Sequence, residues 1–306
     1  MNKPVNMAVT IAGVAFKNPV IAASGAFGFG REYDAFYDIS KLGGISVKGL
    51  TLAPRKGNPP PRVAETPAGM LNSVGLQNPG AAHFVEEELP WLLKRDIVVI
   101  ANIAGNTIAE YCEMARILSD TGTHMVELNI SCPNVKEGGV AFGVEPRTVE
   151  KVTRAVRDRC TKPLIVKLSP NVKSIADTAK AAQAGGADAV SLINTLTGMR
   201  IDITTRRPVL RNNVGGLSGP AVLPVAVRMV YEVRKAVDLP IIGMGGVSRG
   251  ADAAELIIAG ADAVAVGTAC FSDPFAPVRI IDELRQYAES QGICRIGELS
   301  GSVRPY

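Results

Sequence analysis

Short apolar runs alternate with amphipathic segments along most of this chain, and the alternation predicts its secondary structure. Eight runs rich in valine and isoleucine predict strands at residues 19–23, 44–47, 98–103, 126–130, 164–168, 189–193, 240–243 and 263–266. Helical periodicity lies between or after them, at residues 82–94, 107–119, 146–159, 174–184, 221–237, 251–259 and 277–290. Strands that are apolar on both faces and alternate with helices predict a parallel sheet covered by helices.

A faint internal repeat favours closure of this sheet into a barrel. The run Gly186-Ala187-Asp188-Ala189-Val190 recurs as Gly260-Ala261-Asp262-Ala263-Val264, so two successive strand–helix units share one plan. Chance similarity among small apolar residues is the alternative. An eight-stranded barrel takes about 250 residues as one unit. We therefore predict a single (β/α)8 TIM-barrel domain over residues 1–306, with an N-terminal hairpin at about residues 8–17 around Gly13.

Two segments are longer than a minimal barrel needs. Residues 50–80 are rich in proline and glycine, and residues 194–220 carry several arginines and glycines. Both follow predicted strands, so they belong to the C-terminal face, where barrel enzymes keep their active sites. Loops of this length are more often functional than structural. We expect two active-site insertions.

Composition excludes several functions. Hydrophobic residues make up 47% of the 306, the formal charge of +4 is spread along the chain, and no block of like charges suggests a nucleic-acid partner. No apolar run approaches the ~18 residues of a membrane span, so we expect a cytoplasmic protein without a membrane contact. Two histidines and five scattered cysteines without a C-x-x-C pair predict no metal site and no iron–sulfur cluster in this chain.

The residues that end the predicted strands would meet at one mouth of the barrel. They form a polar set without a carboxylate, which suits anionic or carbonyl-rich ligands better than a divalent cation. Its members are Ser24, Lys48, Asn102, Asn129, Lys167, Asn194, Thr195, Gly245, Gly246, Gly267 and Thr268, with Cys132 just beyond Asn129.

The glycines after the last two strands predict a phosphate site. Backbone N–H groups in Gly245-Gly246 and Gly267-Thr268 precede helices, and free N–H groups at such positions bind phosphate. The run 243–248 is too degenerate for a dinucleotide fingerprint, so a mononucleotide phosphate is the better interpretation. Glycines needed only for tight turns are the alternative.

Lys167 lies inside an apolar strand, where a lysine without a partner is rare. Two uses compete: a Schiff-base nucleophile, as in barrel aldolases, or a fixed cation facing a cofactor that becomes an anion on reduction. Lys48 is equally hard to explain by packing. Cys132 could be an inert small hydrophobe, but its place at a strand end favours a thiol that takes a proton from carbon.

Four longer motifs resemble those of class 1 dihydroorotate dehydrogenases. They are residues 129–136 (NISCPNVK), residues 71–80 (LNSVGLQNPG), Ile193-Asn194-Thr195 with Gly198-Met199, and residues 215–220 (GGLSGP). The resemblance runs from about Val9 to about Tyr287 and leaves the tail at 293–306 without an interpretation. The thiol at Cys132 separates class 1 from class 2, which has serine as its base. The longer loops resemble the NAD-linked 1B subclass more than the fumarate-using 1A enzymes.

The resemblance implies one FMN per chain and assigns roles to the polar set. FMN would contact Ser24, Lys48, Gly49, Asn102, Asn129, Lys167, Ile193, Gly219, Gly245, Gly246, Gly267 and Thr268. Dihydroorotate would contact Lys48, Asn72, Ser73, Val74, Gly75, Leu76, Asn129, Asn194 and Thr195. Cys132 would act as the base at C5, Lys167 would stabilise the reduced flavin, and Lys48 would assist at the reacting centre.

The resemblance also implies partners. This chain has neither a clean dinucleotide fingerprint nor clustered cysteines, so FAD, a 2Fe–2S cluster and the NAD site are expected on an iron–sulfur flavoprotein subunit. We expect a homodimer of this chain within a heterotetramer. The alternatives are a fumarate-dependent 1A enzyme, a Schiff-base aldolase that uses Lys167, and a non-catalytic binding barrel.

Overall fold

The computed structural model describes residues 4–130, 136–137 and 140–306. Eight parallel strands form a closed barrel in chain order, and the last strand pairs with the first. The strands are β3 (Val20–Ala22), β4 (Gly44–Ser46), β7 (Val98–Ile103), β8 (Met125–Asn129), β11 (Leu164–Lys167), β12 (Ala189–Leu192), β17 (Ile241–Met244) and β18 (Ala263–Val266). The predicted (β/α)8 barrel is therefore confirmed.

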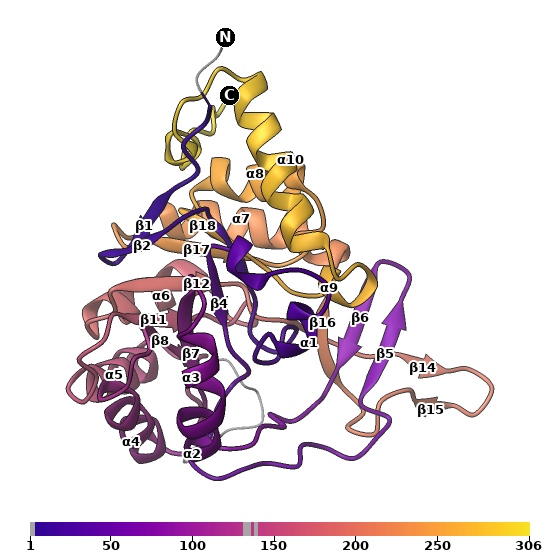
Figure 1. Ribbon diagram of the computed structural model, residues 1–306. Helices are drawn as coiled ribbons and strands as arrows, with labels where there is room; N and C mark the ends of the chain where they lie inside the picture. Colours follow the sequence, from indigo (N-terminus) through magenta and orange to yellow (C-terminus); the bar gives the residue numbers. More distant parts are fainter. Residues whose placement is uncertain (1–3, 131–135, 138–139) are drawn as a thin grey trace.

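Helices surround the barrel and cover its outer face (Figure 1). Those that follow the predicted pattern are α4 (Ile108–Ser119), α5 (Pro146–Arg157), α6 (Ile175–Ala184), α7 (Leu223–Arg234), α8 (Gly250–Ala259) and α10 (Ala276–Ser290). Thr107 and Ser174 cap α4 and α6, each accepting a hydrogen bond from a backbone N–H three residues on. Apolar stripes of these helices and the outward residues of the strands form one large core.

The helices differ from the prediction in two segments, and two short helices are additional. The segment 82–94 divides into α2 (Ala81–His83), a π-helix (Phe84–Glu88) and α3 (Leu89–Leu92), because Pro90 lacks the N–H that a continuous α-helix would use. The helix expected from residue 221 begins as a 3-10 turn (Pro220–Val222) before α7. Two short helices, α1 (Arg31–Asp34) and α9 (Ala269–Ser272), were not predicted.

The barrel interior holds a second, smaller core. Alternate residues of each strand point inward, and a hairpin of β1 (Val9–Ile11) and β2 (Val14–Phe16) packs Ile11 and Phe16 against them. The fit is close, since a Cβ at Gly44 would lie 2.9 Å from the Phe16 ring. The hairpin thereby contributes apolar side chains to the interior, while the polar residues collect at the strands' C-terminal ends.

The two long insertions meet in a single sheet. Strands β5 (Val63–Thr66) and β6 (Gly69–Asn72) come from the first, β13 (Leu196–Gly198) and β16 (Gly215–Ser218) from the second, in the order β13-β16-β6-β5. A further hairpin, β14 (Ile201–Asp202) with β15 (Arg207–Pro208), projects beside this sheet (Figure 1). The sequence indicated two separate loops; the pairing of β16 with β6 joins them.

The internal repeat has a structural explanation. Asp188 accepts hydrogen bonds from Arg157 and from the backbone N–H of Leu164, which starts β11. Asp262 accepts in the same way from Arg234 and from the N–H of Ile241, which starts β17. Each aspartate thus ties the beginning of a strand to the preceding helix, at the face remote from the mouth.

The described N-terminal segment lies beside the C-terminal tail (Figure 1). Asn6 donates its backbone N–H to Cys294 and accepts one from Ile296, so the tail that the sequence left uninterpreted packs against the N-terminal segment. Two short strands, β9 (Lys136–Glu137) and β10 (Val140–Ala141), pair within the loop after β8. In the described part of the chain, no helix is long and apolar enough to span a bilayer.

Candidate active site at the barrel mouth

Lys48 lies at the mouth beside the loop that follows β3. Its backbone N–H donates to Gly28, and its ammonium would lie 3.9 Å from a Cβ placed on Gly25, next to Ser24. The lysine is half-buried. Lys48 and Ser24, predicted from separate strand ends, are therefore neighbours.

Asn102 and Asn129 lie side by side at the ends of β7 and β8. Asn129 Nδ2 donates to Asn102 Oδ1 over 3.5 Å. A Cβ at Gly49 would approach the same oxygen to 2.9 Å, so a larger residue there would displace the Asn102 amide. The three predicted residues Gly49, Asn102 and Asn129 come together.

Below these amides lies a buried acid that the sequence analysis missed. Glu127 accepts hydrogen bonds from Ser46 Oγ (2.7 Å), Asn102 Nδ2 (2.6 Å) and Ser191 Oγ (2.7 Å). The predicted strand-end set holds no carboxylate, but Glu127, two residues before Asn129 on β8, contacts one member of that set, Asn102. A glutamate in the apolar run MVELN was the available signal.

Lys167 ends β11, in register with Asn129 on one side and Ser191 on the other. The residue is only 5% exposed. Within the residues that the structure describes, its ammonium makes no hydrogen bond or ion pair. A buried cation without a counter-charge is costly unless a ligand supplies one. The position therefore fits an anionic or electron-rich group at the mouth.

The glycines after β17 and β18 have different explanations. Gly245 and Gly246 have φ of 120° and 82°, where other residues are strained, and a Cβ at Gly246 would lie 2.8 Å from the backbone of Leu223. Gly267 has neither constraint: a Cβ there would be 3.5 Å from Ala23, an ordinary contact. A glycine that packing does not require often marks the close approach of a ligand.

Two further residues complete this side of the ring. Ile193 packs against Gly245, where a Cβ would lie 3.1 Å from its side chain, and Gly219 approaches Thr268, whose methyl group would lie 3.5 Å from a Cβ at 219. Gly219 has φ of 98°. The structure thus brings the predicted FMN contacts from four different loops to one edge of the mouth.

The predicted substrate turn, residues 72–76, lies over the ring. Leu76 comes within 3.5 Å of a Cβ at Gly49, and Asn78 holds the turn by donating to Leu76 and to the Thr51 hydroxyl. The Ser73 hydroxyl is buried and has no hydrogen-bond partner among the residues that the structure describes. An unpaired buried hydroxyl is available to a ligand.

Asn194 and Thr195 follow β12 and join the same region. Asn194 accepts a hydrogen bond from the Thr195 N–H through Oδ1, and Asn171 Nδ2 donates to the Thr195 carbonyl. A Cβ at Gly216 of β16 would overlap the Thr195 hydroxyl, so the insertion sheet sits directly on this residue. Asn72 reaches the same strand, with Nδ2 3.5 Å from the Gly216 carbonyl.

Cys132, the predicted base, lies outside the described residues. Three other thiols are poor bases at neutral pH, because burial raises the pKa of Cys112, Cys160 and Cys270, the last to about 12. Cys112 lies on α4, Cys160 lies between α5 and β11, and Cys270 lies on α9, two residues after Thr268.

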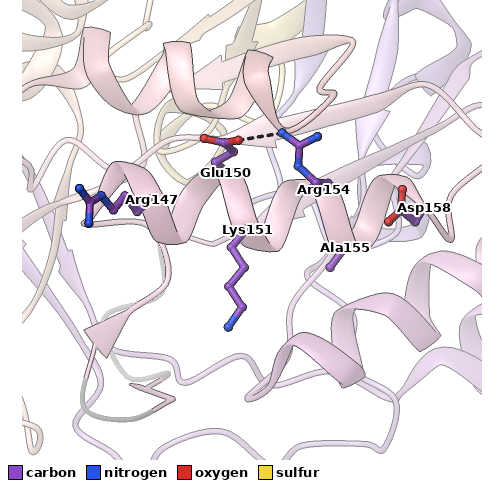
Figure 2. A pocket seen from close by; sticks show the side chains of 6 residues that line it. All are labelled: Arg147, Glu150, Lys151, Arg154, Ala155 and Asp158. Atoms are coloured by element: carbon purple, nitrogen blue, oxygen red, sulfur yellow. Dashed lines mark hydrogen bonds and ion pairs between the residues drawn. The ribbon is translucent and has the colours of Figure 1, made fainter.

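Two surface hollows lie away from the ring. One, on α5, is drawn in Figure 2: Glu150 pairs with Arg154, while Lys151 points to the opposite side. Its side chains diverge and hold no common point. The other lies on the insertion sheet, between Leu71, Met199 and Leu217. Neither includes a predicted site residue.

The fold defines a β/α-barrel enzyme, and its candidate site at the mouth carries carboxamides and lysines. The family model described as dihydroorotate dehydrogenase matches residues 6–287. The chain belongs to the dihydroorotate dehydrogenase family.

Three relatives illustrate the similarity, all named dihydroorotate dehydrogenase B (NAD(+)), catalytic subunit. The protein of Alkaliphilus metalliredigens is 56% identical over 98% of this chain and 99% of its own length. That of Geobacillus sp. (strain WCH70) is 55% identical over 96% and 95%. That of Thermoanaerobacter pseudethanolicus is 54% identical over 98% and 99%.

Proposed function

We propose that this chain oxidises dihydroorotate to orotate with FMN, as the catalytic subunit of an NAD-linked enzyme of pyrimidine synthesis. The observation that carries the proposal is the buried Lys167 ammonium, which has no counter-charge among the described residues and borders a ring of carboxamides. The relatives' printed names support the NAD-linked form over the fumarate-dependent and aldolase alternatives.

The residues present fit FMN. The neighbours of Gly267 would tolerate a Cβ, so its glycine is explained better by the close approach of a ligand than by packing. Gly245, Gly246 and Thr268 would offer backbone N–H groups for the phosphate. Lys167 would face the ring system as a fixed cation, with Ser24, Lys48, Gly49, Asn102, Asn129, Ile193 and Gly219 around it. FMN supplies the electron acceptor for the hydride that leaves C6 of the substrate.

The substrate would lie between this ring and the turn at residues 72–76. Asn72, Asn129, Asn194 and Thr195 present amides and a hydroxyl that match the pyrimidine edge and its carboxylate. The Ser73 hydroxyl, which has no partner in the described part of the chain, is a further donor within the turn. The turn would thereby exclude water from the reacting face while Lys48 balances the substrate carboxylate.

Proton removal is assigned to Cys132. A thiol with an ordinary pKa near ~8.5 takes a proton at mildly alkaline pH when neighbours stabilise the thiolate. Cys132 would take the C5 proton as hydride leaves C6. The other cysteines with raised pKa values do not compete for this role.

The electrons would pass to NAD through a second subunit. The five cysteines are scattered and no clean dinucleotide fingerprint is present, so FAD, the 2Fe–2S cluster and the NAD site are assigned to an iron–sulfur flavoprotein. The name catalytic subunit, carried by the relatives, implies a partner. We assign this chain to a homodimer within a heterotetramer.

The experiment is direct. The purified chain should be yellow, with flavin absorbance near ~450 nm that bleaches when dihydroorotate is added without oxygen. It should reduce an artificial dye and reduce NAD negligibly until the partner subunit is supplied. A colourless chain, or an adduct trapped at Lys167 by borohydride, would overturn the proposal. Efficient NAD reduction by the chain alone would show that no partner subunit is needed for that step.

A further inference from the structure

The barrel contains a buried acid that the proposed reaction does not use. Glu127 is 2% exposed, and its three hydrogen-bond donors, Ser46, Asn102 and Ser191, are no more than 4% exposed. In the described structure Glu127 makes no ion pair, with Lys167 or with any other residue. The three donors are those expected of an ionised carboxylate, which only accepts hydrogen bonds.

Two contacts of Glu127 lie just below the mouth, whereas the third, Asn102, belongs to the mouth and is in register with Glu127. Residues two apart on a strand face the same side, so Ser46 lies beneath Lys48, and Glu127 lies beneath Asn129. Ser191 is in register with Lys167. The carboxylate therefore joins β4, β7, β8 and β12 next to the residues assigned to the flavin, and it contacts one of them, Asn102, directly.

The carboxylate also sets the direction of two amides. Because Glu127 accepts from Asn102 Nδ2, the Asn102 oxygen must point the other way, where it accepts from Asn129 Nδ2. The Asn129 oxygen is then the atom left to face away from Asn102. A neutral amide at position 127 could donate instead, and the chain of amides could reverse.

A purely structural role explains this arrangement poorly. Apolar side chains of similar volume usually join strands as well as buried ionic groups do, without the desolvation penalty of a charge. A buried anion below the mouth has an electrostatic consequence that apolar residues lack. The anion would destabilise the negative charge of a reduced flavin, whereas the Lys167 cation would stabilise that charge.

We propose that Glu127 is a positioning residue that orients the Asn102 and Asn129 amides and, with Lys167, sets the reduction potential of the flavin. The inference rests on the proposed function, because it requires FMN at the mouth. It assigns opposite electrostatic effects to two buried charges: Lys167 raises the potential and Glu127 lowers it.

The first test compares Glu127→Gln with Ser191→Ala. Gln has the same size but no charge, so the flavin potential should rise by about 30 mV, a tenfold shift for a two-electron couple. Ser191→Ala removes one donor and keeps the charge, so its potential should move by less than a third of that. A flavin-loaded Glu127→Gln protein with the wild-type potential would refute the inference.

The second test exchanges the two groups. Asn102→Asp alone places two carboxylates at a contact of 2.6 Å, so it should lose most of its flavin. The double variant Glu127→Gln/Asn102→Asp keeps one acid and one amide and should recover flavin content and orient Asn129 as before. Failure of the double variant to exceed Asn102→Asp would overturn the orienting role.

The exchange also covers the case in which Glu127→Gln does not fold, because the double variant retains the charge and the hydrogen bonds. Recovery of flavin content in the double variant would then support the inference, and a double variant without flavin would refute it. Wild-type protein without flavin would instead count against the proposed function, so the two failures are distinguishable.

Discussion

Replacement of Lys167 by methionine should separate function from stability. Lys167 is 5% exposed and its ammonium has no partner among the described residues, whereas methionine fills similar space without charge. Replacing buried ionic groups by apolar ones commonly stabilises a protein by ~1 to 4 kcal/mol. We expect about 2 kcal/mol here in the flavin-free chain, which corresponds to a rise in Tm of about 4 °C for a chain of this size.

The same change should weaken flavin binding. Loss of one charge-assisted contact removes about 1.4 kcal/mol or more, which is a tenfold or larger fall in FMN affinity. The flavin that remains should have a lower reduction potential, because a fixed cation favours the anionic reduced form.

Thermal unfolding of flavin-free protein and fluorescence titration with FMN measure the two effects. Lys94→Met is the matched control: Lys94 is exposed, so its change should alter stability by less than about 0.5 kcal/mol and leave FMN affinity unchanged. A Lys167→Met protein that is less stable than wild type and binds FMN normally would refute the reasoning, since the lysine would then be structural.

Three further predictions concern the base, the repeat and acid stability. Cys132→Ser should keep its flavin but lose most turnover at neutral pH, and it should regain activity as the pH rises. The control Cys270→Ala should keep the wild-type pH profile. Near-normal turnover of Cys132→Ala would show that the thiol is not the base. Asp262→Ala should lower stability by about 2 kcal/mol in urea unfolding, with kcat unchanged, because Asp262 ties a strand start to Arg234; a change in kcat alone would contradict this role. The Arg95 guanidinium lowers the pKa of Asp34 in the folded protein, so this ion pair stabilises the fold above the unfolded pKa near ~3.9, and that stability is lost as the pH falls through the folded pKa. Asp34→Asn should therefore lower the free energy of unfolding by up to about 1 kcal/mol at pH 7 and by little at pH 2. An equal decrease at both pH values would exclude the ion pair as the cause.

The chain's local patterns determined the barrel. Apolar runs bounded by turns predicted each of the eight strands to within about two residues, since burial on both faces leaves a signal in the sequence itself. The same runs located Lys48, Asn102, Asn129 and Lys167, because a polar residue at the end of an apolar strand is visible without coordinates. Motifs of several residues carried the family resemblance, which the match over residues 6–287 bears out.

Only the tertiary structure decided what meets across the barrel. Ser46, Asn102, Glu127 and Ser191 lie on four strands spread over 146 positions of the chain, and no local pattern indicates that their side chains converge on one carboxylate. The joining of the two insertions through β6 and β16 is likewise invisible locally. Periodicity reports which face of an element is buried, whereas these contacts depend on strand register and barrel closure, which arise only when distant segments pack together.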